Sequence, residues 1–107
     1  MDTAQTLLAL NALAHDARLA VFRLLVQAGP QGHPAGVIAT RLGLAPSALS
    51  FHLKELTRAG LLVQQPAGRR IVYSASFESM HALIGYLTEN CCSGASCGVE
   101  SLTGACA

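Results

Sequence analysis

A very short turn between two segments of helical periodicity restricts the fold of this chain more than any other feature. Residues 35–42 carry apolar side chains at helical spacing and are followed by Gly43, and glycine is the residue that most often terminates a helix. Only Leu44 and Ala45 separate Gly43 from Pro46, and proline is favoured at the first position of a helix. Two short helices joined by so tight a turn predict a helix-turn-helix unit.

The rest of the chain divides into further helices and one hairpin. Alanine (18 residues) and leucine (17 residues) make up a third of the 107 residues, and both are strong helix formers, so we expect a mostly helical protein. The expected helices span about 3–14, 17–28, 35–42, from Pro46 to near Gly60, and 77–90. Strand-favouring residues at 61–65 and 71–75 flank the turn Pro66-Ala67-Gly68 and predict a β-hairpin. This fold class is mostly α with a β-hairpin, a winged helix-turn-helix.

The second helix has an expected start and an expected buried side. Asp16 is of a residue type that favours the N-cap position, so we expect it to cap this helix. A stripe of apolar side chains recurs every three or four residues, and we expect this stripe to face the core. It consists of Leu19, Phe22, Leu25 and Val26, and it leaves Arg18 and Arg23 outside.

The helix that begins at Pro46 separates apolar from polar side chains around its axis. At about 100° per residue, Leu49, Leu53 and Leu56 fall together and should face the core. The opposite face combines hydroxyls, a phenyl ring and two cations, which suits a DNA major groove, where such groups reach phosphates, guanine acceptors and thymine methyls. His52 projects closer to the core side, where a structural histidine is expected, and we keep it among the candidates. The predicted DNA-binding residues are Ser47, Ser50, Phe51, His52, Lys54, Arg58, Arg69 and Arg70.

The net charge of +1 conceals an uneven distribution of charge along the chain. Residues 41–70 hold five basic side chains against Glu55 alone, whereas the remainder holds two basic and five acidic ones. Arg69 and Arg70 follow the predicted hairpin turn, where they would contact backbone phosphates or enter the minor groove. The basic segment therefore coincides with the predicted helix-turn-helix and hairpin.

Several stretches of the chain resemble the ArsR/SmtB family of winged-helix metalloregulators. The similar residues are Ala14-His15-Asp16-Ala17-Arg18-Leu19, then 42–56, then Ala59-Gly60-Leu61-Leu62, and the resemblance covers about residues 10–90. It implies a homodimeric transcriptional repressor that binds operator DNA when metal-free and leaves it when a metal or metalloid binds. It also implies a dimer interface made by the first and last helices. The apolar surface of the first helix and the stripe of Met80, Ile84 and Leu87 independently favour that interface.

Two inducer sites common in this family have no counterpart in this sequence. Many relatives carry a Cys-x-Cys motif in the third helix, where this chain reads His33-Pro34-Ala35-Gly36-Val37. Others bind zinc through aspartate and histidine ligands of the last helix, and here only Glu78 and His81 are present. Neither site can be transferred to this protein.

The four cysteines all lie in the last 17 residues, as Cys91, Cys92, Cys97 and Cys106. Soft thiolates select thiophilic ions, and As(III) and Sb(III) are satisfied by three sulfur donors. We therefore expect Cys91, Cys92 and Cys97 to bind As(III) or Sb(III) as inducer, an expectation that similarity to arsenic-responsive members supports. The expected domains are residues 1–90 for DNA binding and dimerisation and residues 91–107 for a cysteine-containing tail.

Other functions remain open at this point. Zinc or cadmium normally takes four ligands, which would bring in Cys106, and thiol oxidation would form a disulfide such as Cys92 to Cys97. No catalytic constellation is present, so we expect no enzyme. The N-terminus lacks a basic signal-peptide region and the chain has no run of about 18 apolar residues, so we expect a cytoplasmic protein with no membrane partner.

Overall fold

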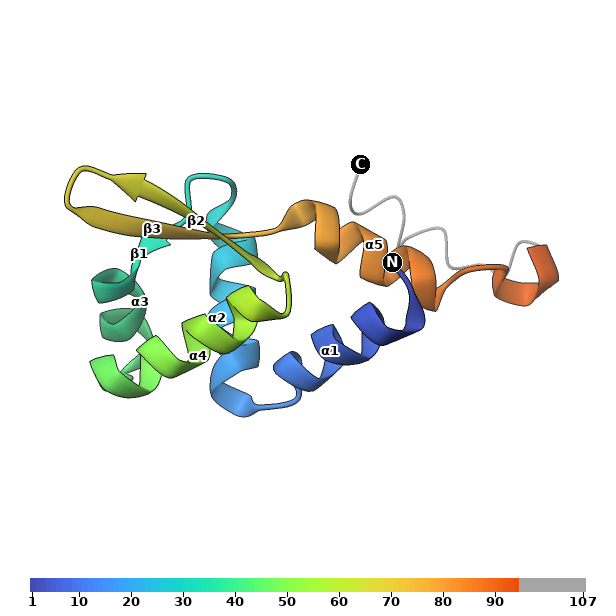
Figure 1. Ribbon diagram of the computed structural model, residues 1–107, viewed down its shortest axis with the longest axis horizontal. Coiled ribbons are helices and arrows are strands. Elements are labelled where there is room, and N and C mark those ends of the chain that lie inside the picture. Colours follow the sequence, from blue (N-terminus) through green and yellow to red (C-terminus); the bar gives the residue numbers. More distant parts are fainter. Residues whose placement is uncertain (95–107) are drawn as a thin grey trace.

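The computed structural model describes residues 1–94, which form five α-helices and a small sheet (Figure 1). The helices are α1 (Thr3–Leu13), α2 (Asp16–Ala28), α3 (Ala35–Leu42), α4 (Pro46–Arg58) and α5 (Phe77–Leu87). The strands are β1 (His33–Pro34), β2 (Leu62–Ala67) and β3 (Arg70–Ala75), and a short 3-10 segment, η1, spans Cys91–Gly94. The predicted fold class, mostly α with a β-hairpin, is therefore confirmed.

The turn between α3 and α4 has the predicted construction. Gly43 is the C-cap of α3 and has a left-handed backbone conformation (φ 65°), which residues with a Cβ atom rarely adopt. Pro46 is the first residue of α4.

The N-terminal end of α2 differs from the prediction. His15, rather than Asp16, is the N-cap, because its Nδ1 accepts a hydrogen bond of 3.1 Å from the backbone N–H of Ala17. Asp16 becomes the first helical residue, where its negative charge favours the positive end of the helix dipole.

The sheet has the strand order β1-β3-β2, and both pairings are antiparallel. Strands β2 and β3 form the wing, which projects away from the helices (Figure 1). The wing turn is shorter than predicted, since β2 continues through Pro66 and Ala67 and only Gly68 and Arg69 lie between the strands. Pro66 is tolerated because β2 lies at a sheet edge, where a missing N–H costs little. Strand β1 was not predicted, because two residues are too few to show a period.

The core lies where α1, α2, α3, α4 and the base of the wing meet. Leu49, Leu53 and Leu56 of α4 are buried, which confirms the predicted core face of that helix. Leu19 is 45% exposed, so its assignment to the core was wrong. It lies about 120° around α2 from the fully buried Leu25, which places it at the rim of the packed face.

Helices α1 and α5 lie side by side at the end of the molecule opposite the wing (Figure 1). Both expose large apolar side chains, and the most exposed are Leu7 (57%) and Leu87 (58%). Helix α5 ends at Leu87, earlier than the predicted residue 90, with Thr88 as C-cap and Asn90 in the left-handed region (φ 55°). The last helix therefore does not continue into the first cysteines. No helix within residues 1–94 has the length and apolar character needed to cross a membrane.

Candidate nucleic-acid interface

Helix α4 presents a polar and basic surface to solvent. Its leucines fix the helix against the core, so the opposite face is held outward. Side chains on that face are exposed, and they include most of the predicted DNA-contacting residues of this helix: Ser47, Ser50, Phe51, Lys54 and Arg58. Phe51 is 54% exposed, which is unusual for a phenyl ring unless it has a binding role or a partner.

His52 does not share this exposed face. Only 9% of the residue is exposed, and its ring lies 4.8 Å, centroid to centroid, from the ring of His15. The Arg18 Nε donates a hydrogen bond of 3.4 Å to His52 Nδ1. The placement of His52 among the DNA-facing residues is thus corrected, because its position on α4 directs it towards α2 rather than to solvent.

The surroundings of His52 favour its neutral form. Burial lowers the pKa of His52 below the ordinary value of 6.5, and the nearby His15 and Arg18 lower it further. A neutral imidazole can leave Nδ1 unprotonated to accept the hydrogen bond from Arg18. His52 therefore helps to fix the N-terminal part of α2 against α4.

Arg18 contacts the exposed side of α4 directly, a contact that the sequence did not reveal. Its guanidinium carbon lies 5.4 Å from the centroid of the Phe51 ring. A cation over an aromatic face is attracted by the ring quadrupole. Helical periodicity identified Arg18 only as a residue outside the core stripe, and no local pattern indicates which ring it meets, because the contact joins residues 33 positions apart.

Arg58, near the end of the exposed face, has one anionic neighbour. Its guanidinium approaches Glu55 at 3.6 Å, while 69% of the Arg58 side chain stays exposed. Ion pairs at such an exposed position contribute little to stability, because water and salt screen them. Arg58 therefore keeps a cationic surface that a phosphate can reach.

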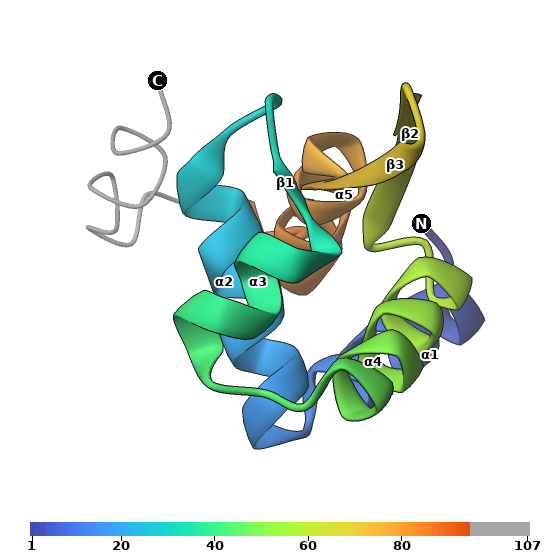
Figure 2. The ribbon, with the colours of Figure 1, turned by 90° about the vertical axis from the view of Figure 1, so that its left-hand side faces the viewer.

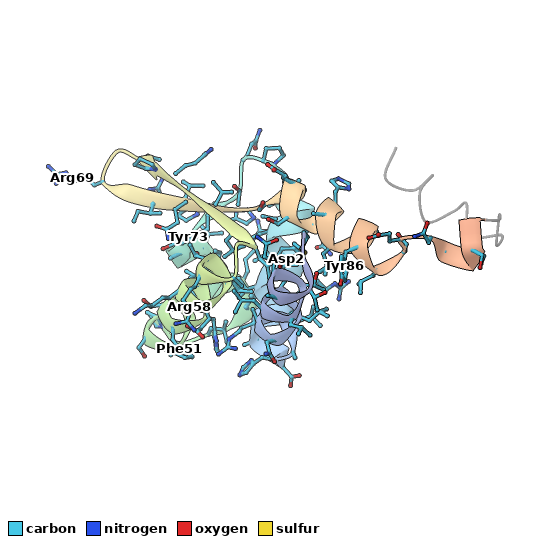
Figure 3. The ribbon with its side chains drawn as sticks, turned by 45° about the vertical axis from the view of Figure 1, so that its right-hand side comes forward. Asp2, Phe51, Arg58, Arg69, Tyr73 and Tyr86 are labelled. Carbon is cyan, nitrogen blue, oxygen red and sulfur yellow. The ribbon has the colours of Figure 1, made fainter. Side chains whose placement is uncertain are left out.

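The wing adds two exposed cations on the same side of the molecule as α4. Arg69 lies in the turn, and Figure 3 shows it at the tip of the wing, pointing away from the helices. Arg70 is the first residue of β3 and is also exposed. Seen end-on in Figure 2, the wing and α4 lie on one side and α2 on the other. The predicted recognition helix and the wing that carries the two arginines thus lie on one side of the fold.

Two of the predicted metal ligands lie just beyond α5. Cys91 and Cys92 are exposed, and their Sγ atoms are 3.6 Å apart. Cys97 and Cys106 lie outside the described residues. Within residues 1–94, no three histidine, cysteine, aspartate or glutamate side chains come together to hold a metal.

Comparison with known proteins shows that other proteins contain a similar helix-turn-helix domain. A helix-turn-helix domain model matches residues 13–65. The HTH-type transcriptional regulator YgaV of Escherichia coli K12 is 35% identical over 83 residues, which are 78% of this chain and 82% of that protein.

Two solved structures extend the similarity to the whole fold. An ArsR-like transcriptional regulator from Rhodococcus sp. RHA1 superposes with a TM-score of 0.70 and 27% identity, over 78% of this chain and 76% of that one. The homodimeric winged helix-turn-helix domain Mb0332 from Mycobacterium bovis, a possible ArsR-family regulator, gives a TM-score of 0.65 with 27% identity over 81% of each chain.

A helix-turn-helix whose second helix exposes cations, followed by a basic wing, defines a winged helix-turn-helix protein of the DNA-binding class. The chain belongs to the family of helix-turn-helix transcriptional regulators with the ArsR-type fold. Its relatives are regulators, which confirms the expectation that the chain is not an enzyme.

Proposed function

We propose that this protein is a homodimeric repressor that binds operator DNA and is released when As(III) or Sb(III) binds its cysteines. The observation that carries the DNA-binding part is that α4 and the wing lie on one side of the fold (Figure 2), and that both carry exposed cationic side chains. Lys54 and Arg58 supply charge along the helix, and Phe51 supplies an apolar group for a thymine methyl.

The dimer is inferred from unpartnered apolar surface. Leu7, Leu8 and Leu10 of α1 and Ile84 and Leu87 of α5 are all more than a third exposed within one chain. Clustered apolar side chains of this size are usually covered by another surface. The similar domain Mb0332 is a homodimer, and the same arrangement here would place two copies of α4 about one DNA turn apart.

The inducer is inferred from the chemistry of the thiols. Cys91 and Cys92 are adjacent in the sequence, so one ion would bond both once each is a thiolate. Two such donors alone suit either zinc or a metalloid. The number of sulfur donors separates them, since a metalloid is satisfied by Cys91, Cys92 and Cys97, whereas zinc needs a fourth ligand such as Cys106.

The position of the thiols suggests how a bound ion would act on the DNA-binding face. Thr88, Glu89 and Asn90 separate Cys91 from the end of α5. Helix α5 contacts α1 through the Tyr86 and Thr3 hydroxyls. Drawing residues 91–97 into a compact loop would favour a different position of α5 in the dimer and thus a different spacing of the two α4 helices.

A solved structure described as a possible transcriptional regulator for arsenical resistance has this fold, with a TM-score of 0.64 and 25% identity over 74% of this chain and 79% of that one.

The test is release from DNA, followed by fluorescence anisotropy on an operator selected from randomised duplexes. Reduced protein is titrated with As(III), Sb(III), an organic As(III), Zn(II), Cd(II) and an oxidant. We expect As(III) or Sb(III) to release the wild type and the control Cys106→Ser. The variants Cys91→Ser, Cys92→Ser and Cys97→Ser should bind DNA with wild-type affinity and stay bound when As(III) is added.

Two other outcomes identify the alternative sensors. Release by Zn(II) or Cd(II) that is lost in Cys106→Ser indicates a four-ligand metal sensor. Release by the oxidant alone indicates a thiol-redox repressor. Unchanged release by As(III) in all three cysteine variants would contradict the proposed metalloid site.

A further inference from the structure

A polar groove separates α4 from the wing. The DNA-binding residues predicted from the sequence make up only part of its lining. Six residues line it: Ser50, Lys54, Thr57, Arg58, Gln64 and Tyr73. We propose that this groove, the helix-wing notch, binds one phosphate of the DNA backbone and that Gln64 and Tyr73 are DNA contacts. The inference rests on the proposed DNA binding and assigns a ligand to a part of that interface.

The fold brings the two walls of the notch together from distant parts of the sequence. Ser50, Lys54 and Arg58 recur every four residues and therefore form one stripe along α4. On the wing, Gln64 pairs with Tyr73 across the antiparallel strands, so both side chains lie on the same sheet face. Figure 3 shows Tyr73 between the wing and α4.

The chemistry of the lining selects an anion. Lys54 and Arg58 carry positive charge, and the other lining residues carry hydroxyl or amide groups that can donate hydrogen bonds. Among residues 1–94, no carboxylate lines the notch itself, and Glu55 pairs with the lining residue Arg58 from outside it. Charged donors combined with neutral ones are the usual partners of phosphate oxygens in protein–DNA interfaces.

One hydroxyl at the notch has no hydrogen-bond partner among residues 1–94. Thr57 Oγ1 is buried in the structure and makes no such bond there. Buried hydroxyls are normally paired, and Thr57 lines the notch, so we expect Oγ1 to turn towards an acceptor that binds there.

The position of the notch indicates a phosphate within DNA rather than another anion. It is lined by residues of α4, the helix proposed for the major groove, and of the wing, proposed for the backbone or minor groove. Figure 2 shows α4 and the wing on one side of the fold. A DNA strand that runs from one element to the other passes this point. One phosphate in each half-site would therefore enter the notch.

The wing strand offers a matched pair of variants to test this assignment. Gln64 lines the notch, whereas its neighbour Gln65 points to the opposite sheet face, since side chains alternate along a strand. We expect Gln64→Ala and Tyr73→Phe to weaken operator binding about 3- to 10-fold, and Gln65→Ala to leave it unchanged. The slope of log K against log[salt] should stay at the wild-type value in both notch variants, because neither removes a charge.

The decisive measurement replaces each operator phosphate in turn by a neutral methylphosphonate. In the wild type, one position per half-site should show a strong loss of affinity that is clearly smaller in Tyr73→Phe and in Gln64→Ala. If the protein binds the operator but every phosphate replacement lowers the affinity equally in the wild type and in both variants, the notch does not bind a particular phosphate. That result would leave the proposed function intact. A wild-type protein that selects no DNA sequence at all would instead overturn the proposed function.

Discussion

The guanidinium of Arg18 covers one face of the Phe51 ring, with Cζ 5.4 Å from the ring centroid. The same side chain donates to Nδ1 of His52 at 3.4 Å. One residue of α2 therefore contacts two successive residues of α4, of which one is exposed and the other buried. We expect this contact to hold the Phe51 ring in a single orientation on the exposed side of α4, which we propose contacts DNA.

Replacement of Arg18 by lysine should impair base recognition more than general DNA affinity. Lysine keeps the charge but loses the planar group that stacks on Phe51 and the fixed donor to His52. Replacing operator thymines by uracil removes the methyl groups, and we expect one such replacement to weaken wild-type binding several-fold and Arg18→Lys binding much less. Anisotropy titrations on both duplexes measure this. An equal loss in both proteins would mean that Arg18 does not position Phe51.

The lowered pKa of His52 predicts a loss of stability on mild acidification. Between the lowered folded-state pKa and the unfolded-state value near 6.5, the unfolded chain binds a proton that the folded protein excludes. The free energy of unfolding should be constant above that range and fall as the pH decreases through it. Urea unfolding at pH 7.5 and 5.5 gives the difference, and His52→Gln should show a smaller one. The same pH dependence in both proteins would assign it to other groups.

The wing arginines should contribute affinity that depends on salt and not on sequence. Neutralising a side chain that contacts a phosphate lowers the slope of log K against log[salt] by about 1. We expect this change for Arg69→Gln and for Arg70→Gln, on operator and on random DNA alike. Arg23→Gln serves as the control, because Arg23 is an exposed cation of α2 outside the proposed interface. If its slope changes as much as those of the wing variants, the wing has no special role.

The exposed leucines of α1 and α5 should determine the oligomeric state. Leu7→Glu or Leu87→Glu would place a charge in the proposed dimer interface, and we expect monomers by light scattering with unchanged helical circular dichroism. Operator affinity should fall at least 10-fold, because two linked half-sites are no longer bound together. Ile71→Glu, on the wing, tests for a general effect of removing exposed apolar surface and should remain dimeric. Dimeric Leu7→Glu and Leu87→Glu proteins would place the interface elsewhere.

Predictions made from the sequence were correct where local rules decide the structure. The buried leucines of α4 follow from the helical period, and the turn at Gly43 and Pro46 follows from backbone preferences. Tertiary packing and local competition between neighbouring residues decided the rest. His15 caps α2 because it occupies the N-cap position in place of its neighbour Asp16. Leu19 lies at the rim of the core and Arg18 reaches Phe51 because of packing against residues that are distant in the sequence. The ligand geometry at Cys97 lies outside the described residues, so that part of the candidate site stays a prediction.

The end of α5 at Leu87 has a consequence for how this protein can change in evolution. Three residues without helical structure join α5 to the first cysteine, and Cys91 and Cys92 contribute nothing to the buried core. Mutations at residues 91–94, which are all exposed, therefore face few packing constraints from the helices and the wing. Under the proposed function, specificity for a chemical signal would diverge in this segment while recognition of the same DNA sequence is retained, so sensing and DNA reading would form separable modules.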